Sequence, residues 1–155
     1  MADIVSRTVS VYAFKVVGRG PRYLVLRRAP ARKLAGAWQA VHGHVERGES
    51  SPVAAARELL EETGLAARAL WSADHVERVY DPRKDEIRLV PCFAALVAGK
   101  VRLSREHDAA RWLTAREAAR LFTFENQRAA LAVVHRDVGR VAARGAEASP
   151  FLRIV

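Results

Sequence analysis

Apolar and polar positions along the chain follow two different periods, which separate the expected strands from the expected helices. Segments rich in β-branched and aromatic residues at 8–17 and 23–26 predict two strands, and the turn at 18–21 joins them into a hairpin. Apolar residues spaced three or four apart predict helices in the Ala- and Leu-rich segments. Such a mixture of strands and helices indicates an α/β domain. Further strands are expected at 38–45, 69–78 and 87–97, and helices at 52–64, 114–121 and 125 to about 143.

The helix expected at 52–64 has clear start and stop signals. Ser51 suits the N-cap, Pro52 suits the first helical position, and Gly64 is typical of a residue that ends a helix. A helical wheel divides this segment into an apolar side and an acidic side, and we expect the acidic side to face outward. The apolar side consists of Val53, Ala56, Leu59, Leu60 and Thr63, and the acidic side of Glu58, Glu61 and Glu62.

The acidic side of this helix carries an unusual concentration of charge. Residues three and four apart are neighbours on a helix, and each like-charge pair costs roughly 0.2–0.5 kcal/mol. Glu61 and Glu62 also lie in the last turn, where the helix dipole disfavours negative charge. An ordinary solvated face is one interpretation, but only Arg57, four residues before Glu61, can offset part of this charge. The pattern therefore favours a bound cation.

Length and composition indicate one soluble globular domain spanning residues 1–155. Half of the 155 residues are hydrophobic, and no apolar run approaches the roughly 18 residues of a membrane span. The first residues lack the pattern of a secretory signal, and Cys92 is the only cysteine, so no internal disulfide can form. Both observations favour the cytoplasm, and we expect no membrane partner.

The formal net charge of +9 raises the alternative of a polyanionic partner. The basic residues are scattered along the chain, however, and lack the interleaved aromatic residues of single-strand binders. The excess of Arg and Ala is more typical of a compositional habit than of a binding surface. We therefore expect no nucleic-acid polymer as a partner.

Residues 43–65 read GHVERGESSPVAAARELLEETGL and place a set of glycines and charged residues at fixed spacing. This stretch resembles the signature of the Nudix hydrolases at every specified position. The resemblance implies an α/β/α sandwich around a mixed β-sheet. It also implies hydrolysis of a nucleoside diphosphate linked to another moiety. The matching positions are Gly43, Glu49, Arg57, Glu58, Leu59, Glu61, Glu62, Gly64 and Leu65.

The acids of this stretch suit a magnesium site. Mg²⁺ prefers oxygen ligands, keeps several waters and is usually held by a few carboxylates together with substrate phosphates. Such a metal can neutralise a diphosphate, orient the attacking water and stabilise the leaving group. We therefore expect a requirement for Mg²⁺, with Mn²⁺ as the alternative.

The resemblance also implies roles for single residues. Glu58 and Glu62 would be the main metal ligands, the Gly43 carbonyl would be another, and Glu61 would be a further ligand or a proton acceptor. Arg57 and Glu49 would pair and hold the loop against the helix.

The general base is open, because members of the family differ in the acid that deprotonates the water. The segment REHDAARWL at 105–113 resembles the part of dihydroneopterin triphosphate and dATP pyrophosphohydrolases that places an additional metal-binding glutamate. Glu106 matches that position, although a lone Glu in a loop is more often simply solvated. Glu61 and Glu106 remain the two candidates.

Candidate substrate contacts lie in three further stretches that resemble the same branch: 23–30, 38–49 and 107–131. Arg27 or Arg28 could clamp phosphates, although an alternating strand should point only one of them at the site. His44 could contact phosphate or be a plain loop position, and with His42 it lacks the third ligand of a transition-metal site. Glu77, Tyr80 and Asp81 begin a polar turn that could form a lid over the substrate, with an ordinary exposed hairpin as the alternative. Trp38, Gln39, Asn126 and Gln127 are candidates for the base pocket, with core packing or helix capping as the alternatives.

We expect a pyrophosphohydrolase that converts triphosphates of the dATP or dihydroneopterin type to monophosphate and pyrophosphate. A dinucleoside polyphosphate hydrolase, which GHVERGE also resembles, is the first alternative, and a sanitiser of oxidised nucleotides is the second. A nucleotide sensor without turnover is the non-enzymatic alternative, but it would show an incomplete set of acids. The expected partner is a small nucleotide, and the chain could be a monomer or a homodimer.

Overall fold

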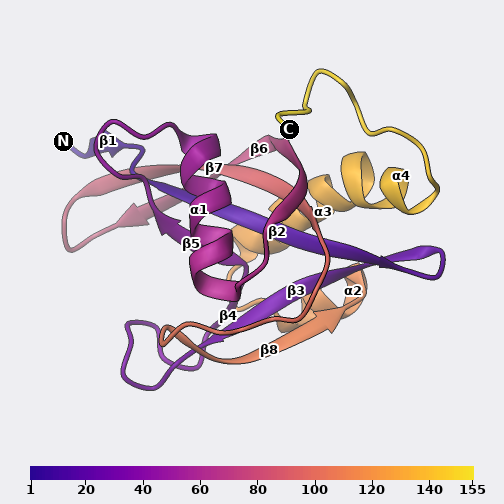
Figure 1. The fold of residues 1–155 in the computed structure, drawn as a ribbon. Coiled ribbons are helices and arrows are strands. Elements are labelled where there is room, and N and C mark those ends of the chain that lie inside the picture. Colours follow the sequence, from indigo (N-terminus) through magenta and orange to yellow (C-terminus); the bar gives the residue numbers. More distant parts are fainter.

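Eight strands form one mixed β-sheet in the computed structural model, which describes residues 1–155 (Figure 1). The central strand β2 runs parallel to β7 and antiparallel to β3 and β5. β1 pairs in parallel with the first residues of β7, β6 forms a long hairpin with β7, and β3 also pairs with β4 and β8. The strands are β1 (Asp3–Val5), β2 (Thr8–Val17), β3 (Gly20–Arg28), β4 (Trp38–Gln39), β5 (Val41–His44), β6 (Ala67–Asp81), β7 (Glu86–Val97) and β8 (His107–Leu113).

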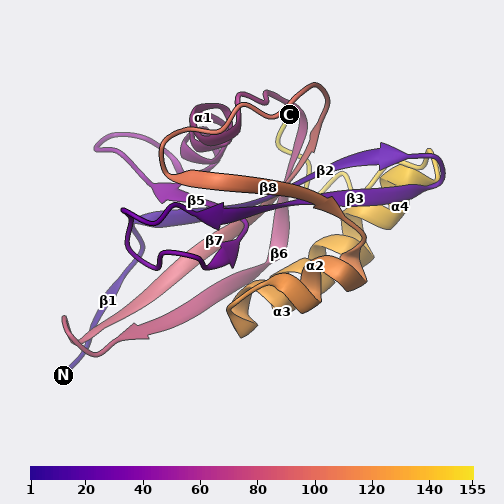
Figure 2. The same cartoon turned by 90° about the horizontal axis from the view of Figure 1, so that it is seen from below.

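Helices cover both faces of this sheet. Figure 2 shows α1 (Ser51–Thr63) on one face and α2 (Ala115–Leu121), α3 (Glu125–Val134) and α4 (Arg140–Ala143) on the other. A π-helical turn, His135–Gly139, joins α3 to α4. The expected α/β/α sandwich around a mixed sheet is therefore confirmed. None of the helices combines the length and apolar character needed to cross a lipid bilayer.

Alternating residues of β2 divide the hydrophobic core into two layers. Val9, Val11 and Ala13 belong to the cluster under α1, whereas Tyr12 and Phe14 belong to the cluster under α2 and α3. This alternation follows from the period of two in a strand, and both faces are apolar because both are covered.

The expected strands and helices agree with the structure, with some differences in detail. The hairpin forms between β2 and β3, and the expected strand at 38–45 is interrupted at Ala40, whose N–H donates to the Oε1 atom of Gln127 at 3.2 Å. Ser50, not Ser51, is the N-cap of α1, and its side chain makes no capping hydrogen bond. The short strand β1 and the strand β8 have weaker patterns and were not expected.

The expected orientation of α1 is wrong for one acid and two apolar residues. Glu62 is buried at 3% exposure, whereas Val53 and Leu60 are exposed at 58% and 52%. Ala54 and Ala55 are fully buried and small, so the helix lies close to the sheet on that side. The buried side of α1 consists of Ala54, Ala55, Leu59, Glu62 and Thr63. Leu60 lies on the solvent side of the helix.

Candidate active site

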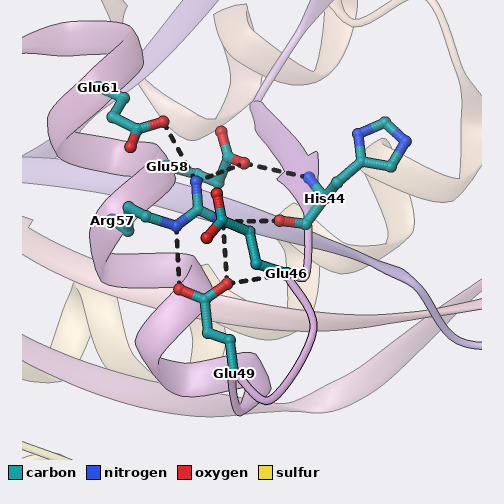
Figure 3. Close-up of polar contacts among 6 residues, drawn as sticks. All are labelled: His44, Glu46, Glu49, Arg57, Glu58 and Glu61. Atoms are coloured by element: carbon teal, nitrogen blue, oxygen red, sulfur yellow. Dashed lines mark hydrogen bonds and ion pairs between the residues drawn. The ribbon is translucent and has the colours of Figure 1, made fainter.

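Arg57, in the middle of α1, connects this helix to the loop that precedes it (Figure 3). Its Nε and Nη2 atoms donate to the two carboxylate oxygens of Glu49, both at 2.9 Å. Nη2 also donates to the carbonyl oxygen of His44 at 2.7 Å, and Nη1 donates to Glu58 at 2.9 Å and Glu61 at 3.1 Å. The bidentate bond to Arg57 lowers the pKa of Glu49. The structure therefore brings Arg57 and Glu49 together as the sequence predicted, in a position that fixes the loop.

Glu58 lies directly against the backbone of β5. The N–H of His44 donates to its Oε1 atom at 3.1 Å, and a Cβ atom added to Gly43 would overlap the Glu58 carboxyl group. Only glycine therefore leaves room for this carboxylate beside the strand. Burial is the largest cause of a raised pKa at Glu58, and the hydrogen bond from Arg57 opposes it. The imidazole of His44 points away from this cluster (Figure 3).

Glu62 is a buried carboxylate without a hydrogen-bond partner at either oxygen. Burial, and then the nearby carboxylates of Glu106 and Glu58, raise its pKa to about 9. The Nδ1 atom of His107, also buried and without a partner, lies 3.8 Å from Oε2 of Glu62. Buried polar groups without partners are rare and costly, so this pair marks a position where a cation would be strongly favoured.

Glu106 and Arg28 complete the polar surroundings of Glu62. Nη1 of Arg28 donates to Oε2 of Glu106 at 3.1 Å. Neighbouring residues of a strand point to opposite faces, and Arg27 instead makes two bonds to Asp108, at 2.8 and 3.2 Å. Of the two arginines that the sequence left open, Arg28 therefore faces the acidic cluster.

A cavity of about 190 Å³ brings these groups together. Glu61 does not line it, because its exposed side chain is held by Arg57 on the outer face of α1. Lys33 and Leu34 line the cavity from the loop between β3 and β4, and no motif in the sequence marked them as site residues. The cavity is lined by Arg28, Lys33, Leu34, Gln39, His42, Gly43, His44, Glu58, Glu62 and Glu106.

The donor set of this cavity fits Mg²⁺ better than a transition metal. No three His, Cys, Asp or Glu side chains converge into a closed ligand cage. An open set of carboxylates is typical of Mg²⁺, which keeps several waters and takes further oxygens from phosphates, whereas structural Zn²⁺ needs four converging ligands. The two oxygens of Glu62 without partners and the close approach of Gly43 to Glu58 leave oxygen donors available for such an ion.

A second cavity, of about 310 Å³, adjoins the first and shares Leu34, Gln39 and His42 with it. Asn126 and Gln127, two of the residues predicted for a base pocket, line it from the start of α3. Gln127 also has a structural bond, because its side chain accepts from the Ala40 N–H. The remaining lining residues are Thr8, Glu77, Val79, Arg88, Val90 and Phe124.

Trp38 lies away from both cavities. Its ring is flanked by the guanidinium groups of Arg27 and Arg111, 5.6 and 4.9 Å from the ring centroid, and it packs at the edge of the core beneath α2 and α3. The structure does not bring Trp38 into the site, because the strand that carries it alternates with Gln39, which does line both cavities.

A third and larger cavity, of about 800 Å³, adjoins the first cavity, with which it shares Lys33, Leu34 and His44. It also shares Thr8, Leu34 and Arg88 with the second cavity. The turn between β6 and β7 forms part of its wall. Five of its eleven lining residues are Arg or Lys, and two are acidic. The basic members are Arg7, Lys33, Arg83, Lys84 and Arg88, and the acidic members are Asp81 and Glu86.

Comparison with known proteins gives several related sequences. Residues 6–135 match the family model of the NUDIX domain. An octanoyltransferase of Myxococcus xanthus is 40% identical over 79% of this chain, but the match covers only 34% of that protein. The asymmetrical bis(5′-nucleosyl)-tetraphosphatase of Rattus norvegicus is 36% identical over 63% of this chain and 69% of that protein. A Mycobacterium tuberculosis protein proposed to be an 8-oxo-dGTP diphosphatase is 35% identical over 64% of this chain and 69% of that protein.

The fold is also shared with solved structures. A proposed NUDIX hydrolase of Listeria monocytogenes superimposes with a TM-score of 0.72 and 26% identity, over 85% of this chain and 93% of the other. The family model covers most of the chain, including the loop and helix that carry Gly43, Glu49, Arg57, Glu58 and Glu62. The chain therefore belongs to the NUDIX family.

Proposed function

We propose that this NUDIX-family protein hydrolyses nucleoside triphosphates or related pterin triphosphates to monophosphate and pyrophosphate, with Mg²⁺ as the preferred metal. The proposal rests mainly on one observation: the buried Glu62 carboxylate has no partner and faces a cavity that also contains Glu58 and Glu106. The combination of these acids with Arg28 and Lys33 suits a substrate phosphate that is bound together with a cation.

Four groups are the proposed holders of the metal: the carboxylates of Glu58, Glu62 and Glu106 and the carbonyl oxygen of Gly43. A bound Mg²⁺ would supply charge neutralisation and activation of a water for attack on phosphorus. Arg57 has a positioning role, because its bonds to Glu49 and to the His44 carbonyl hold the loop in place.

The basic groups of the cavity serve the phosphates. Arg28 is held by its bond to the Lys33 carbonyl oxygen at 3.1 Å, and Lys33 lines the same cavity. Glu106 is the favoured proton acceptor, because it lies in the cavity while Glu61 is exposed and bound to Arg57.

The second cavity is the proposed site of the base or pterin ring. Its volume of about 310 Å³ and its apolar lining residues suit a flat heterocycle, and it adjoins the acidic cluster through Gln39 and His42. Asn126 is available from α3 to contact the ring edge.

A dinucleoside polyphosphate is the second candidate substrate. The large basic cavity adjoins both the acidic cluster and the proposed ring pocket, and Lys33, Arg83 and Lys84 line it without an ion pair. Such a cavity could take the distal nucleotide of a longer polyphosphate chain. The similarity to the Rattus norvegicus tetraphosphatase agrees with this second candidate.

A substrate panel tests the proposal. The protein is incubated with Mg²⁺ and with dATP, dGTP, 8-oxo-dGTP, dihydroneopterin triphosphate, diadenosine tetraphosphate, NADH or ADP-ribose, and the products are separated by chromatography. We expect monophosphate and pyrophosphate from at least one triphosphate, and no product with Glu62→Gln. Preferential cleavage of diadenosine tetraphosphate would favour the second candidate. Nucleotide binding without turnover would instead make the protein a sensor.

A further inference from the structure

Glu77 is the only acidic residue that lines the proposed ring pocket. It lies on β6 opposite Val90 of β7, and it is only 3% exposed. Glu77 forms no salt bridge, and Arg88, the one arginine in the same cavity, pairs instead with Asp81 and Glu86. A buried carboxylate that has no cationic partner and lines a cavity is a candidate contact for a ligand that carries N–H donors.

The protein itself fixes the orientation of this carboxylate. The Tyr12 hydroxyl donates to Oε1 at 2.6 Å, the Ser10 hydroxyl donates to Oε2 at 3.3 Å, and the Cys92 thiol donates to Oε1 at 3.4 Å. Burial, together with the charge of Glu77, raises the pKa of Tyr12 and Cys92, so both remain protonated donors. An ionised carboxylate has about four acceptor positions, two on each oxygen, and the two hydroxyl bonds occupy one position on each oxygen. The Cys92 thiol is a weak donor that also lies 3.5 Å from the Val90 carbonyl oxygen, so each oxygen of Glu77 keeps one position for a ligand N–H.

The rest of the pocket suits a flat, polar-edged ring. Leu34, Val79, Val90 and Phe124 supply apolar surface. The Oδ1 atom of Asn126 accepts from the Arg78 N–H at 3.4 Å, which leaves the Asn126 amide NH₂ free to donate into the pocket. The pocket therefore offers a buried acceptor from Glu77 and a donor from Asn126.

We propose that Glu77 determines the ring specificity by accepting two neighbouring N–H donors of a 2-amino-4-oxopyrimidine ring, as found in guanine and pterin, while Asn126 donates to the ring carbonyl. This inference rests on the proposed function, because it assigns the ring of the same substrate. Adenine is disfavoured, since it presents a ring nitrogen lone pair where guanine presents N–H. Hypoxanthine retains the ring N–H but lacks the amino group, so it isolates one of the two bonds.

Discrimination between guanine and hypoxanthine provides the first test. The kcat/KM of the full chain is measured for dGTP, dITP and dATP with Mg²⁺, and the affinities for dGMP and dIMP are measured by calorimetry without metal. Sites that hydrogen-bond a substrate group reject analogues without it, and we expect dGTP to exceed dITP by about 10- to 100-fold. Equal kcat/KM for dGTP and dITP, or a preference for dATP, would overturn the assignment while leaving the proposed function intact.

The substitution Glu77→Gln provides the second test. It retains an acceptor for Tyr12 but replaces half of the carboxylate by a donor, so we expect the dGTP-to-dITP ratio of kcat/KM to fall to within about threefold of unity. The loss should appear mainly in KM for dGTP, with kcat for dITP little changed. Asp74→Asn is the matched control, because it makes the same charge change on an exposed residue of the same strand and should leave the ratio unchanged.

The calorimetry tests the role of Glu77 independently of the proposed hydrolysis. If no triphosphate is turned over but dGMP binds at least tenfold more tightly than dIMP, the proposed hydrolysis fails and the role of Glu77 stands. An unchanged ratio in Glu77→Gln, or the absence of any preference for dGMP, would assign Glu77 a purely structural role and overturn the inference.

Discussion

The Nδ1 atom of His107 faces the Oε2 atom of Glu62 across 3.8 Å inside the protein, and neither atom has a hydrogen-bond partner. The amide nitrogen of Gln39 lies 3.3 Å from the other ring nitrogen of His107, so donation from Gln39 places the ring proton on Nδ1. Burial lowers the pKa of His107 to about 4, and the ring is therefore neutral near pH 7. Glu62 thus has a neutral N–H neighbour rather than a counter-charge, which leaves it available to a metal.

We predict that Glu62→Gln abolishes turnover but does not reduce stability without metal. The substitution removes a proposed metal ligand, and we expect a loss in kcat of more than about 100-fold. Because burial raises the pKa of Glu62 to about 9, folding without metal near pH 7 requires this carboxyl group to take up a proton, which costs free energy. Glutamine avoids that cost, so the free energy of unfolding in EDTA should stay the same or rise by about 1–3 kcal/mol. Urea unfolding measures this energy, with the exposed Glu61→Gln as the control for charge.

Added Mg²⁺ should stabilise the unaltered chain more than the variant Glu62→Gln. At about 100 times its dissociation constant, Mg²⁺ stabilises a folded protein by about 2.7 kcal/mol. We expect this increase for the unaltered chain and little of it for Glu62→Gln. Near-normal rates in Glu62→Gln, or equal stabilisation of both proteins by Mg²⁺, would contradict the assignment of Glu62 as a ligand.

A substitution of His107 should act through the metal. His107→Phe keeps a buried ring of similar size but removes the N–H that faces Glu62. Groups that orient a metal ligand typically contribute 10- to 100-fold, and we expect the Mg²⁺ concentration for half-maximal turnover to rise by about that factor. Asp108→Asn is the neighbouring control, because Asp108 pairs with Arg27 outside the cavity. An unchanged Mg²⁺ dependence in His107→Phe would show that His107 does not orient Glu62.

Gly43→Ala should disable the site without unfolding the chain. The added Cβ would collide with the Glu58 carboxyl group, and Glu58 would have to leave its bond to the His44 N–H. Because Gly43 does not have a positive φ, the backbone itself accepts alanine. We expect kcat/KM to fall at least about 100-fold, with a change in unfolding free energy below about 2 kcal/mol. Gly18→Ala tests the general cost of such a change at an open turn with positive φ, where activity should persist.

Two substitutions should distinguish the candidate bases. Glu106→Gln removes the carboxylate that lines the cavity, and Glu61→Gln removes the exposed one that Arg57 holds. General bases typically contribute 10²- to 10⁴-fold, so we expect a loss in kcat of this order for Glu106→Gln and a loss below about tenfold for Glu61→Gln. Single-turnover rates measure the chemical step directly. The reverse order of the two losses would return the role of base to Glu61.

The parts of the site that local spacing predicts are those formed over short separations, whereas Glu106 and Asn126 were predicted only through the family resemblance. Gly43, Glu49 and Arg57 lie on one loop and one helix, so fixed spacing brings them together once α1 forms. The helical wheel failed at Glu62, because amphipathic patterns treat every acid as exposed and cannot identify one that is buried beside a cavity.

Longer separations and the arrangement of the sheet account for the rest. Glu77 meets Tyr12 and Ser10 across 65 and 67 residues of sequence, and no local pattern reports such a contact. Alternation shows that only one of Arg27 and Arg28 can face the acidic cluster, but which one does depends on how β3 sits in the sheet between β2 and β8. These features depend on sheet topology, which one sequence specifies only through the complete fold.

The Tyr23–His135 pair should make stability depend on pH independently of the active site. The Tyr23 hydroxyl, whose pKa burial raises, donates to Nδ1 of His135 at 2.8 Å, and burial lowers the pKa of His135. The folded chain therefore takes up a proton on His135 at lower pH than the unfolded chain, whose His pKa is about 6.5. The stabilisation that the Tyr23–His135 pair contributes is therefore present above about pH 6.5 and is lost as the pH falls toward the lower pKa of His135 in the folded chain.

The variant His135→Gln isolates this contribution, because glutamine can accept the same hydrogen bond but does not titrate. We expect the two proteins to have similar unfolding free energies at about pH 7.5, and the unaltered chain to be the less stable by about 1 kcal/mol at about pH 5. His42 and His107 titrate in both proteins, so their contributions cancel in the difference. Urea unfolding between these two pH values measures the unfolding free energy of both proteins. If this free energy changes with pH equally in both, the hydrogen bond from Tyr23 does not depend on the protonation of His135.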